Sequence, residues 1–138
     1  MELKKKLKTW FIIHFTIDVI FAAVLFIAPV TFLSFMGWES VDSYTARLVA
    51  AALFGIGIES LLARKSTLES FKSMLMLKVI WSAAAVIGTA ISLIENAQGR
   101  PLLAWGILLI FFAFNIVWTR FFFLVRRRLS EVKNADNV

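Results

Sequence analysis

The chain of 138 residues has no cysteine, a single histidine and two prolines. The absence of cysteine excludes disulfides, thiolate metal sites and thiol catalysis. With one histidine in the chain, a metal site built from His14, Asp18 and Glu59 is disfavoured, and we expect neither a metal nor a cofactor. Phosphate-binding loops and hydrolase motifs such as G-x-S-x-G are missing as well. The remaining candidates for chemistry are isolated polar side chains.

Charge is also scarce, because only 17% of the residues are charged and 60% are hydrophobic. The mean hydropathy is +0.83, and a water-soluble domain of this length could not bury so much apolar surface. Fourteen Phe and five Trp lie in or beside the long apolar runs. Lipid is therefore the expected solvent, and we expect an all-α integral membrane protein without a cleavable signal peptide.

Four apolar segments alternate with short polar breaks, and each is close to the ~20 residues that cross a bilayer as a helix. The expected spans cover residues of about 9–28, 44–63, 72–94 and 101–124. Pro29 ends the first span, and a short interfacial helix is expected over 29–36, ending near Gly37. Short connections favour antiparallel neighbours. The prediction is one four-helix bundle domain over 1–128, with a polar cytoplasmic tail over 129–138.

Two of these helices begin with recognisable capping residues. Asp42 or Ser43 is expected to cap the second span, because their side-chain oxygens can accept bonds from the first free amides of a helix. Ser66 and Glu69 have the S-x-x-E spacing of a capping box. The third helix is therefore expected to begin near Thr67.

Basic residues are concentrated at one side of the expected bundle: Lys4, Lys5, Lys6, Lys8, Arg64, Lys65, Lys72, Arg126, Arg127, Arg128 and Lys133. The opposite loops hold only Arg47 and Arg100, and Arg47 is expected to pair with an acidic neighbour, Glu39, Asp42 or Glu95. The positive-inside rule places both termini in the cytoplasm, in a cytoplasmic or inner membrane. The net charge of +6 then indicates attraction to anionic lipid and not nucleic-acid binding.

Polar side chains interrupt every span at a similar depth in the expected cytoplasmic half. The candidate ligand-binding or proton-relay residues are His14, Asp18, Glu59, Lys78, Asn115 and Arg120. An isolated charge in hydrocarbon is costly, so each carboxylate is expected to be paired, protonated or hydrated. The alternative for the basic residues is snorkelling, in which the charged end reaches the headgroups. Three stripes are expected on packed faces: His14/Asp18/Ala22, Ala51/Gly55/Glu59 and Lys78/Ser82/Ala85.

The segment "APVTFLSFMGW" followed by "ARLVAAALFGIGIESLLAR" resembles the small DoxX-like four-helix membrane proteins. In that family a proline ends the first span and an arginine opens a second span rich in Gly and Ala, here Pro29 and Arg47. The resemblance covers about the first half of the chain. It implies a four-helix membrane fold and carries no assigned activity.

The leading hypothesis is a non-enzymatic membrane protein whose polar cluster binds a lipid or an amphipathic small molecule, or relays protons. Asp18 and Glu59 would be its acids, Lys78 the counter-ion and His14 the group that tunes protonation. One alternative is a lipid-modifying enzyme with a carboxylate as general acid or base. Another is a structural subunit that pairs with a membrane-protein partner or a second copy. Membrane lipids are the expected partners, and nucleic acid is not expected.

Overall fold

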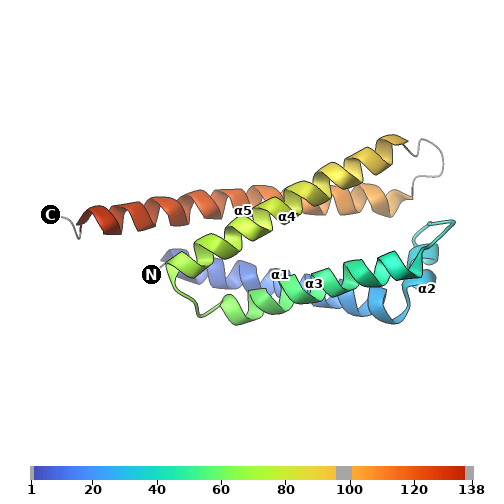
Figure 1. Ribbon diagram of the computed structural model, residues 1–138, viewed down its shortest axis with the longest axis horizontal. Coiled ribbons are helices and arrows are strands. Elements are labelled where there is room, and N and C mark those ends of the chain that lie inside the picture. Colours follow the sequence, from blue (N-terminus) through green and yellow to red (C-terminus); the bar gives the residue numbers. More distant parts are fainter. Residues whose placement is uncertain (1, 96–100, 136–138) are drawn as a thin grey trace. The chain divides into compact units, whose positions relative to one another are not determined.

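The protein is all-helical across residues 2–95 and 101–135, which are the residues that the computed structural model describes (Figure 1). Its helices are α1 (Glu2–Ile27), α2 (Pro29–Phe35), α3 (Ser43–Ala63), α4 (Leu68–Glu95) and α5 (Leu102–Ala135). All except α2 are long and apolar enough to cross a membrane, which confirms four apolar helices and indicates a multi-pass membrane protein. Arg100 and the end of the predicted tail, 136–138, lie outside the described residues.

The chain divides into two compact units. Unit 1 comprises Met1–Lys65 with Gln98–Leu103 and contains α1, α2 and α3. Unit 2 comprises Ser66–Ala97 with Ala104–Val138 and contains α4 and nearly all of α5. The prediction of a single domain over 1–128 stays a prediction.

In unit 1, α1 packs along α3 with one continuous face of each helix buried. The buried residues of α1 are Leu7, Phe11, His14, Asp18, Ala22 and Leu25, a spacing of three and four that follows one side of a helix. Those of α3 are Ala46, Ala50, Gly57, Ser60 and Ala63. Because these buried residues of α3 are all small, the backbones of α1 and α3 can approach closely.

The expected packed stripe of α3 was wrong at Ala51 and Gly55, whereas the carboxylate oxygens of its third member, Glu59, are buried. Ala51 and Gly55 are exposed, and a Cβ added to Gly55 would find nothing within 4 Å. The buried stripe instead passes through Ala50 and Gly57. A shift of one residue turns a helix by about 100°, so the glycine that meets α1 is Gly57.

The break between α1 and α2 follows from proline. Pro29 is the first residue of α2, where its missing N–H costs no helical bond, and Ala28 leaves the helical conformation with φ −135°. The other end of α2 is closed by Gly37, whose φ of +99° lies in the left-handed region. The Trp38 N–H donates to Leu33 O at 3.0 Å and the Gly37 N–H to Ser34 O at 3.0 Å, the bond pattern of a glycine C-terminal cap.

The helix starts confirm one expected cap and correct another. Asp42 caps α3, since its carboxylate accepts from the Tyr44 N–H at 3.0 Å and the Thr45 N–H at 3.3 Å. The cap of α4 is Thr67, whose hydroxyl accepts from the Ser70 N–H at 3.3 Å. The predicted Ser66 capping box was therefore wrong by one residue, because α4 begins at Leu68.

Arg47 makes a different contact from the expected ion pair. Its Nε donates to the carbonyl oxygen of Phe26 at 3.1 Å, and it has no ion pair with any acidic residue in the described ranges 2–95 and 101–135. The Phe26 carbonyl belongs to the last turn of α1, where carbonyls have no helical partner. Arg47 thus joins the end of α1 to the beginning of α3 through the backbone.

In unit 2, the buried face of α4 begins with Phe71, Leu75, Lys78 and Ser82, again at spacings of three and four. The α5 helix buries Ala104, Trp118, Phe121 and Val125. It then continues past its apolar run through three consecutive arginines to Ala135. The described part of the predicted tail, 129–135, is therefore helical.

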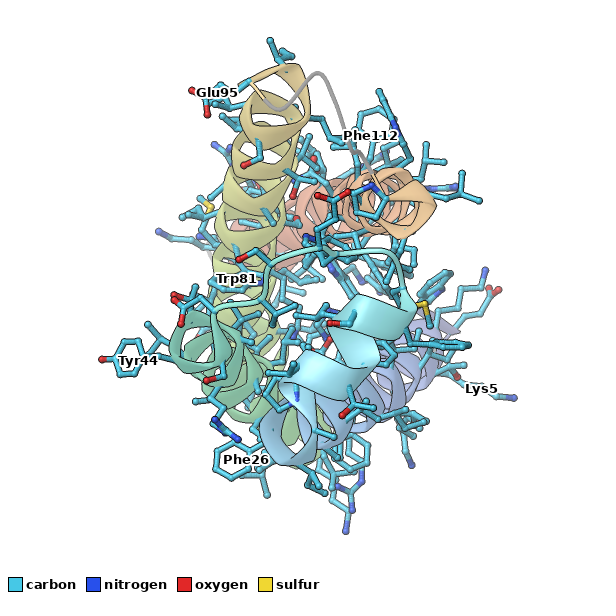
Figure 2. The ribbon with its side chains drawn as sticks, turned by 90° about the vertical axis from the view of Figure 1, so that its right-hand side faces the viewer. Lys5, Phe26, Tyr44, Trp81, Glu95 and Phe112 are labelled. Carbon is cyan, nitrogen blue, oxygen red and sulfur yellow. The ribbon has the colours of Figure 1, made fainter. Side chains whose placement is uncertain are left out.

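Large apolar side chains cover the outside of the long helices. Leu102 is 86% exposed and Ile27 78% exposed. The rings of Phe26, Tyr44 and Phe112 point away from their own helices (Figure 2), and all three are exposed. Such a surface is unfavourable in water and is the normal surface of a protein embedded in lipid.

Candidate functional site

His14 and Asp18 form a buried pair on α1. The Nδ1 atom of His14 lies 2.9 Å from Oδ2 of Asp18, and each residue is only 6% exposed. The spacing of four residues places both side chains on the same face of the helix. This is the face that packs against α3, so the pair lies inside unit 1 and away from its apolar surface.

The backbone of α3 closes over this pair at Gly57. A Cβ added to Gly57 would lie 2.9 Å from the Cβ of Asp18 and 3.4 Å from Cγ2 of Val19. Such close approach leaves no room for another group between Gly57 and Asp18. The stem of Asp18 is therefore held in the packed contact between α1 and α3.

Two charge states are available to the pair. A neutral imidazole can bond to a neutral carboxylic acid, or an imidazolium can bond to a carboxylate, and both states carry no net charge. Adding one proton gives a singly positive pair, and removing one gives a singly negative pair. Because a net charge is costly in an apolar surrounding, either change alters the energy of the packed helices.

Glu59 lies on a different part of α3 from the residue that meets Asp18. It is two residues beyond Gly57, which turns its side chain about 200° around the helix. Both of its carboxylate oxygens are buried. Glu59 belongs to unit 1 and Lys78 to unit 2, so the predicted pairing of these two residues stays a prediction.

A second polar cluster lies in unit 2, between α4 and α5. The Nδ2 atom of Asn115 donates to Ser82 Oγ at 2.9 Å and to Val79 O at 3.0 Å, and the Ser82 hydroxyl donates to Lys78 O at 2.7 Å. These bonds connect a polar side chain of α5 to the backbone of α4. Two of the predicted site residues are thus brought into one network, Asn115 through its side-chain amide and Lys78 through its backbone carbonyl.

Lys78 also has an aromatic neighbour that was not predicted from the sequence. Its Nζ lies 5.6 Å from the ring centroid of Trp118, within the range of a cation–π interaction, and it is only 1% exposed. Trp118 stacks on Phe114 with centroids 5.6 Å apart and ring planes 8° apart. The sequence signal for this neighbour was limited to the spacing of Asn115 and Trp118, which places both residues on one face of α5.

Arg120 does not share this face. Its side chain is exposed, and it lies about 140° around α5 from Asn115. An exposed arginine near the polar end of a long apolar helix matches the snorkelling alternative.

Within residues 2–95 and 101–135, no group of three His, Asp or Glu side chains is close enough to hold a metal ion. No protein-family model, no curated protein and no solved structure matches this chain.

Proposed function

We propose that this chain is a non-enzymatic, multi-pass membrane protein that takes up and releases a proton at the His14–Asp18 pair. The observation that supports it is the 2.9 Å contact between two titratable groups that are both buried in one packed helix face. Intramembrane ionisable residues are rare because of their cost, and they commonly belong to proton and ion pathways. Histidine is the side chain whose usual titration range lies nearest to neutral pH.

Proton exchange at the pair is tied to the contact between α1 and α3. Desolvation disfavours a net charge on the pair, because both side chains are buried and Gly57 packs against Asp18. The other ionisable groups of α3 are Tyr44, Arg47, Glu59 and, at its end, Arg64, and α2 contains none. Glu59, with its buried carboxylate oxygens, is the candidate for a second proton-binding group in unit 1.

The proposed membrane arrangement is an antiparallel four-helix bundle in a cytoplasmic or inner membrane, with both termini in the cytoplasm. It is supported by the bias of lysine and arginine toward one set of helix ends. We also propose, as part of this membrane arrangement, that the chain is related to the small DoxX-like four-helix membrane proteins that its first half resembles.

Introduced cysteines can test this topology directly, because the native chain has none. Ser40 and Ser130 are both exposed, and they lie at opposite expected sides of the membrane. In intact cells that express the protein, a membrane-impermeant maleimide should label Ser40→Cys and should label Ser130→Cys only after the cells are permeabilised. The reverse pattern, or labelling of both in intact cells, would contradict the proposed orientation.

Proton binding can be tested by infrared difference spectroscopy on the full chain in liposomes. A pH step between about 5 and 8, the range in which histidine usually titrates, should change a carboxyl band that disappears in Asp18→Asn and moves in His14→Gln. Asp42→Asn is the matched control, because Asp42 is an exposed helix cap. If the spectrum and the proton uptake of Asp18→Asn equal those of the native protein, the pair is structural and the proposal fails.

Glu59→Gln separates a single proton-binding pair from a longer relay. Proton flux through liposomes, followed with an enclosed pH-sensitive dye, should fall in Asp18→Asn. A similar fall in Glu59→Gln would support a relay through both acids. Flux that is unchanged in both variants would contradict proton transport.

A further inference from the structure

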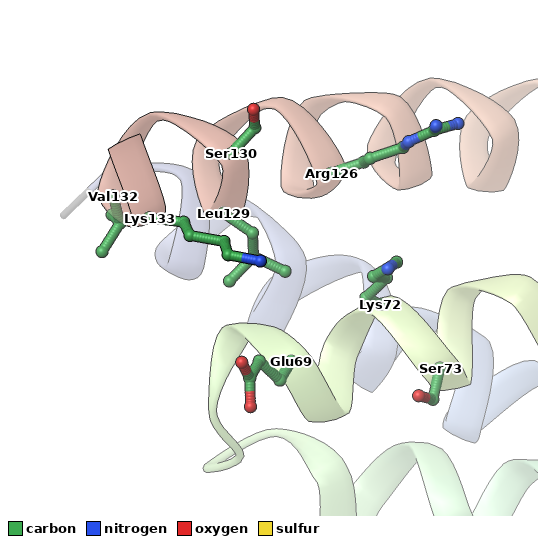
Figure 3. Close-up of a pocket in the computed structure, with 8 residues that line it drawn as sticks. All are labelled: Glu69, Lys72, Ser73, Arg126, Leu129, Ser130, Val132 and Lys133. Atoms are coloured by element: carbon green, nitrogen blue, oxygen red, sulfur yellow. The ribbon is translucent and has the colours of Figure 1, made fainter. Parts of the chain in front are cut away.

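A pocket of about 640 Å³ lies between the polar ends of α4 and α5 in unit 2 (Figure 3). The α4 residues that line it are Glu69, Lys72 and Ser73, and those of α5 are Arg126, Leu129, Ser130, Val132 and Lys133. Three positive side chains and one carboxylate therefore line the pocket. The side chains of Lys72 and Lys133 extend into the space between the two helices (Figure 3).

These cations differ from the basic residues beside them. Arg127 and Arg128 bond to Glu131 at 3.1 Å each. In the part of the chain that the structure describes, Lys72, Arg126 and Lys133 have no such ion pair. Among residues 2–95 and 101–135, the pocket is thus lined by positive charge that no carboxylate neutralises at bonding distance, and such a site attracts an anion.

The position of the pocket along the helices indicates where that anion would come from. Lys72 and Ser73 directly precede the apolar run of α4, and Arg126 directly follows the apolar run of α5. Both sets of residues therefore lie where the apolar spans end, which is the level of lipid headgroups in a membrane. Leu129 and Val132 add apolar surface that can contact the glycerol region of a lipid, and the two serine hydroxyls can donate to phosphate oxygens.

From this combination we propose that the pocket binds the phosphate of an anionic phospholipid headgroup. Basic pockets between membrane helices at the cytoplasmic side are suited to such headgroups, and arginine can form paired bonds to phosphate oxygens. The site is distinct from the His14–Asp18 pair, which lies in the other unit. It requires only that the polar ends of α4 and α5 lie at a membrane surface.

Native mass spectrometry of the full chain in detergent tests the proposal, with phosphatidylglycerol and phosphatidylcholine of identical acyl chains as probes. Phosphatidylglycerol should bind more tightly than phosphatidylcholine. Arg126→Gln should weaken phosphatidylglycerol binding about fivefold, and Lys72→Gln with Lys133→Gln should weaken it further. Arg126→Lys keeps the charge and should therefore retain most of the native affinity for phosphatidylglycerol.

Arg127→Gln is the matched control, since it removes the same charge from the adjacent residue but does not line the pocket. It should weaken binding by less than about twofold, because only general attraction to the basic helix end is lost. Equal losses in Arg126→Gln and Arg127→Gln would overturn the proposed site. Equal affinity for the two lipids would also overturn it.

Inorganic phosphate is the second probe, and it distinguishes a lipid from a soluble source. Phosphate that binds the native chain as tightly as phosphatidylglycerol, and loses affinity in Arg126→Gln, would overturn the lipid assignment. Asp18→Asn should leave phosphatidylglycerol binding unchanged. A failure of the proton proposal is thereby separated from a failure of this one.

Discussion

Gly57 of α3 lies directly against Asp18 of α1, so closely that a Cβ on residue 57 would come within 2.9 Å of the Asp18 Cβ. The carbonyl oxygen of Phe15 would be 3.6 Å away. The atom in the way is a Cβ fixed to the α1 backbone and not the end of a flexible side chain, so it cannot turn aside. Glycine is therefore needed at residue 57 for close packing and not for an unusual backbone conformation.

Gly57→Ala should destabilise the protein by about 1–3 kcal/mol, the usual cost of forcing an extra carbon into a packed core. The added methyl group would push α3 away from α1 at the His14–Asp18 pair. Unfolding by SDS in mixed micelles measures the change in free energy.

Gly55→Ala is the control for this substitution. A Cβ at Gly55 meets nothing within 4 Å, and alanine is the better helix former by up to about 1 kcal/mol. The two variants should therefore change stability in opposite directions. Equal effects would show that Gly57 does not mark the close approach of the two helices.

Much of the fold could be predicted from the sequence, because the strongest signals are local. Each apolar run is long enough to cross a membrane, and Pro29 marks the end of the first helix. The packed face of α3 could not be predicted this way. Gly55 and Gly57 each lie in a stripe with small residues one turn away, and only the shape of α1 decides which stripe meets it.

The same distinction applies to the candidate site. The spacing of four residues within one helix predicted that His14 and Asp18 share a face, and their 2.9 Å contact arises within that face. The contact of Lys78 with Trp118 depends on how α4 and α5 are aligned, which spacing does not reveal. The partner of Arg47 was missed for another reason, since its acceptor is a backbone carbonyl and not a charged side chain.

Arg47→Leu should destabilise the protein by about 0.5–1.5 kcal/mol, because it removes the hydrogen bond to the Phe26 carbonyl. This carbonyl lies in the last turn of α1, where no helical N–H is available to replace the arginine. The side chain is exposed, which keeps the effect modest. Glu39→Gln and Glu95→Gln provide the comparison and should change stability by less than about 0.5 kcal/mol. A larger effect in either variant would support the ion pair that was predicted from the sequence.

Asn115 and Ser82 should be energetically coupled across α4 and α5. Their bond is 2.9 Å long, and interhelical hydrogen bonds in membrane proteins contribute about 0.6 kcal/mol on average. A double-mutant cycle with Asn115→Leu and Ser82→Ala, measured by unfolding in mixed micelles, should give a coupling of this size. Ser73 is exposed and distant along α4, so Asn115→Leu and Ser73→Ala should be additive within about 0.5 kcal/mol.

Asp42 should make the stability of unit 1 depend on pH in acid. The Thr45 hydroxyl and the Tyr44 amide, which bond to the carboxylate, hold the pKa of Asp42 below its ordinary value of 3.8. A lowered pKa in the folded state means that ionised Asp42 contributes stability above 3.8, and that this contribution is lost as the pH falls through the folded value. Asp42→Asn should keep the helix cap but remove this titration. The unfolding temperature of the native protein should therefore fall more steeply below pH 4, roughly, than that of Asp42→Asn, and parallel curves would show that the cap does not depend on charge.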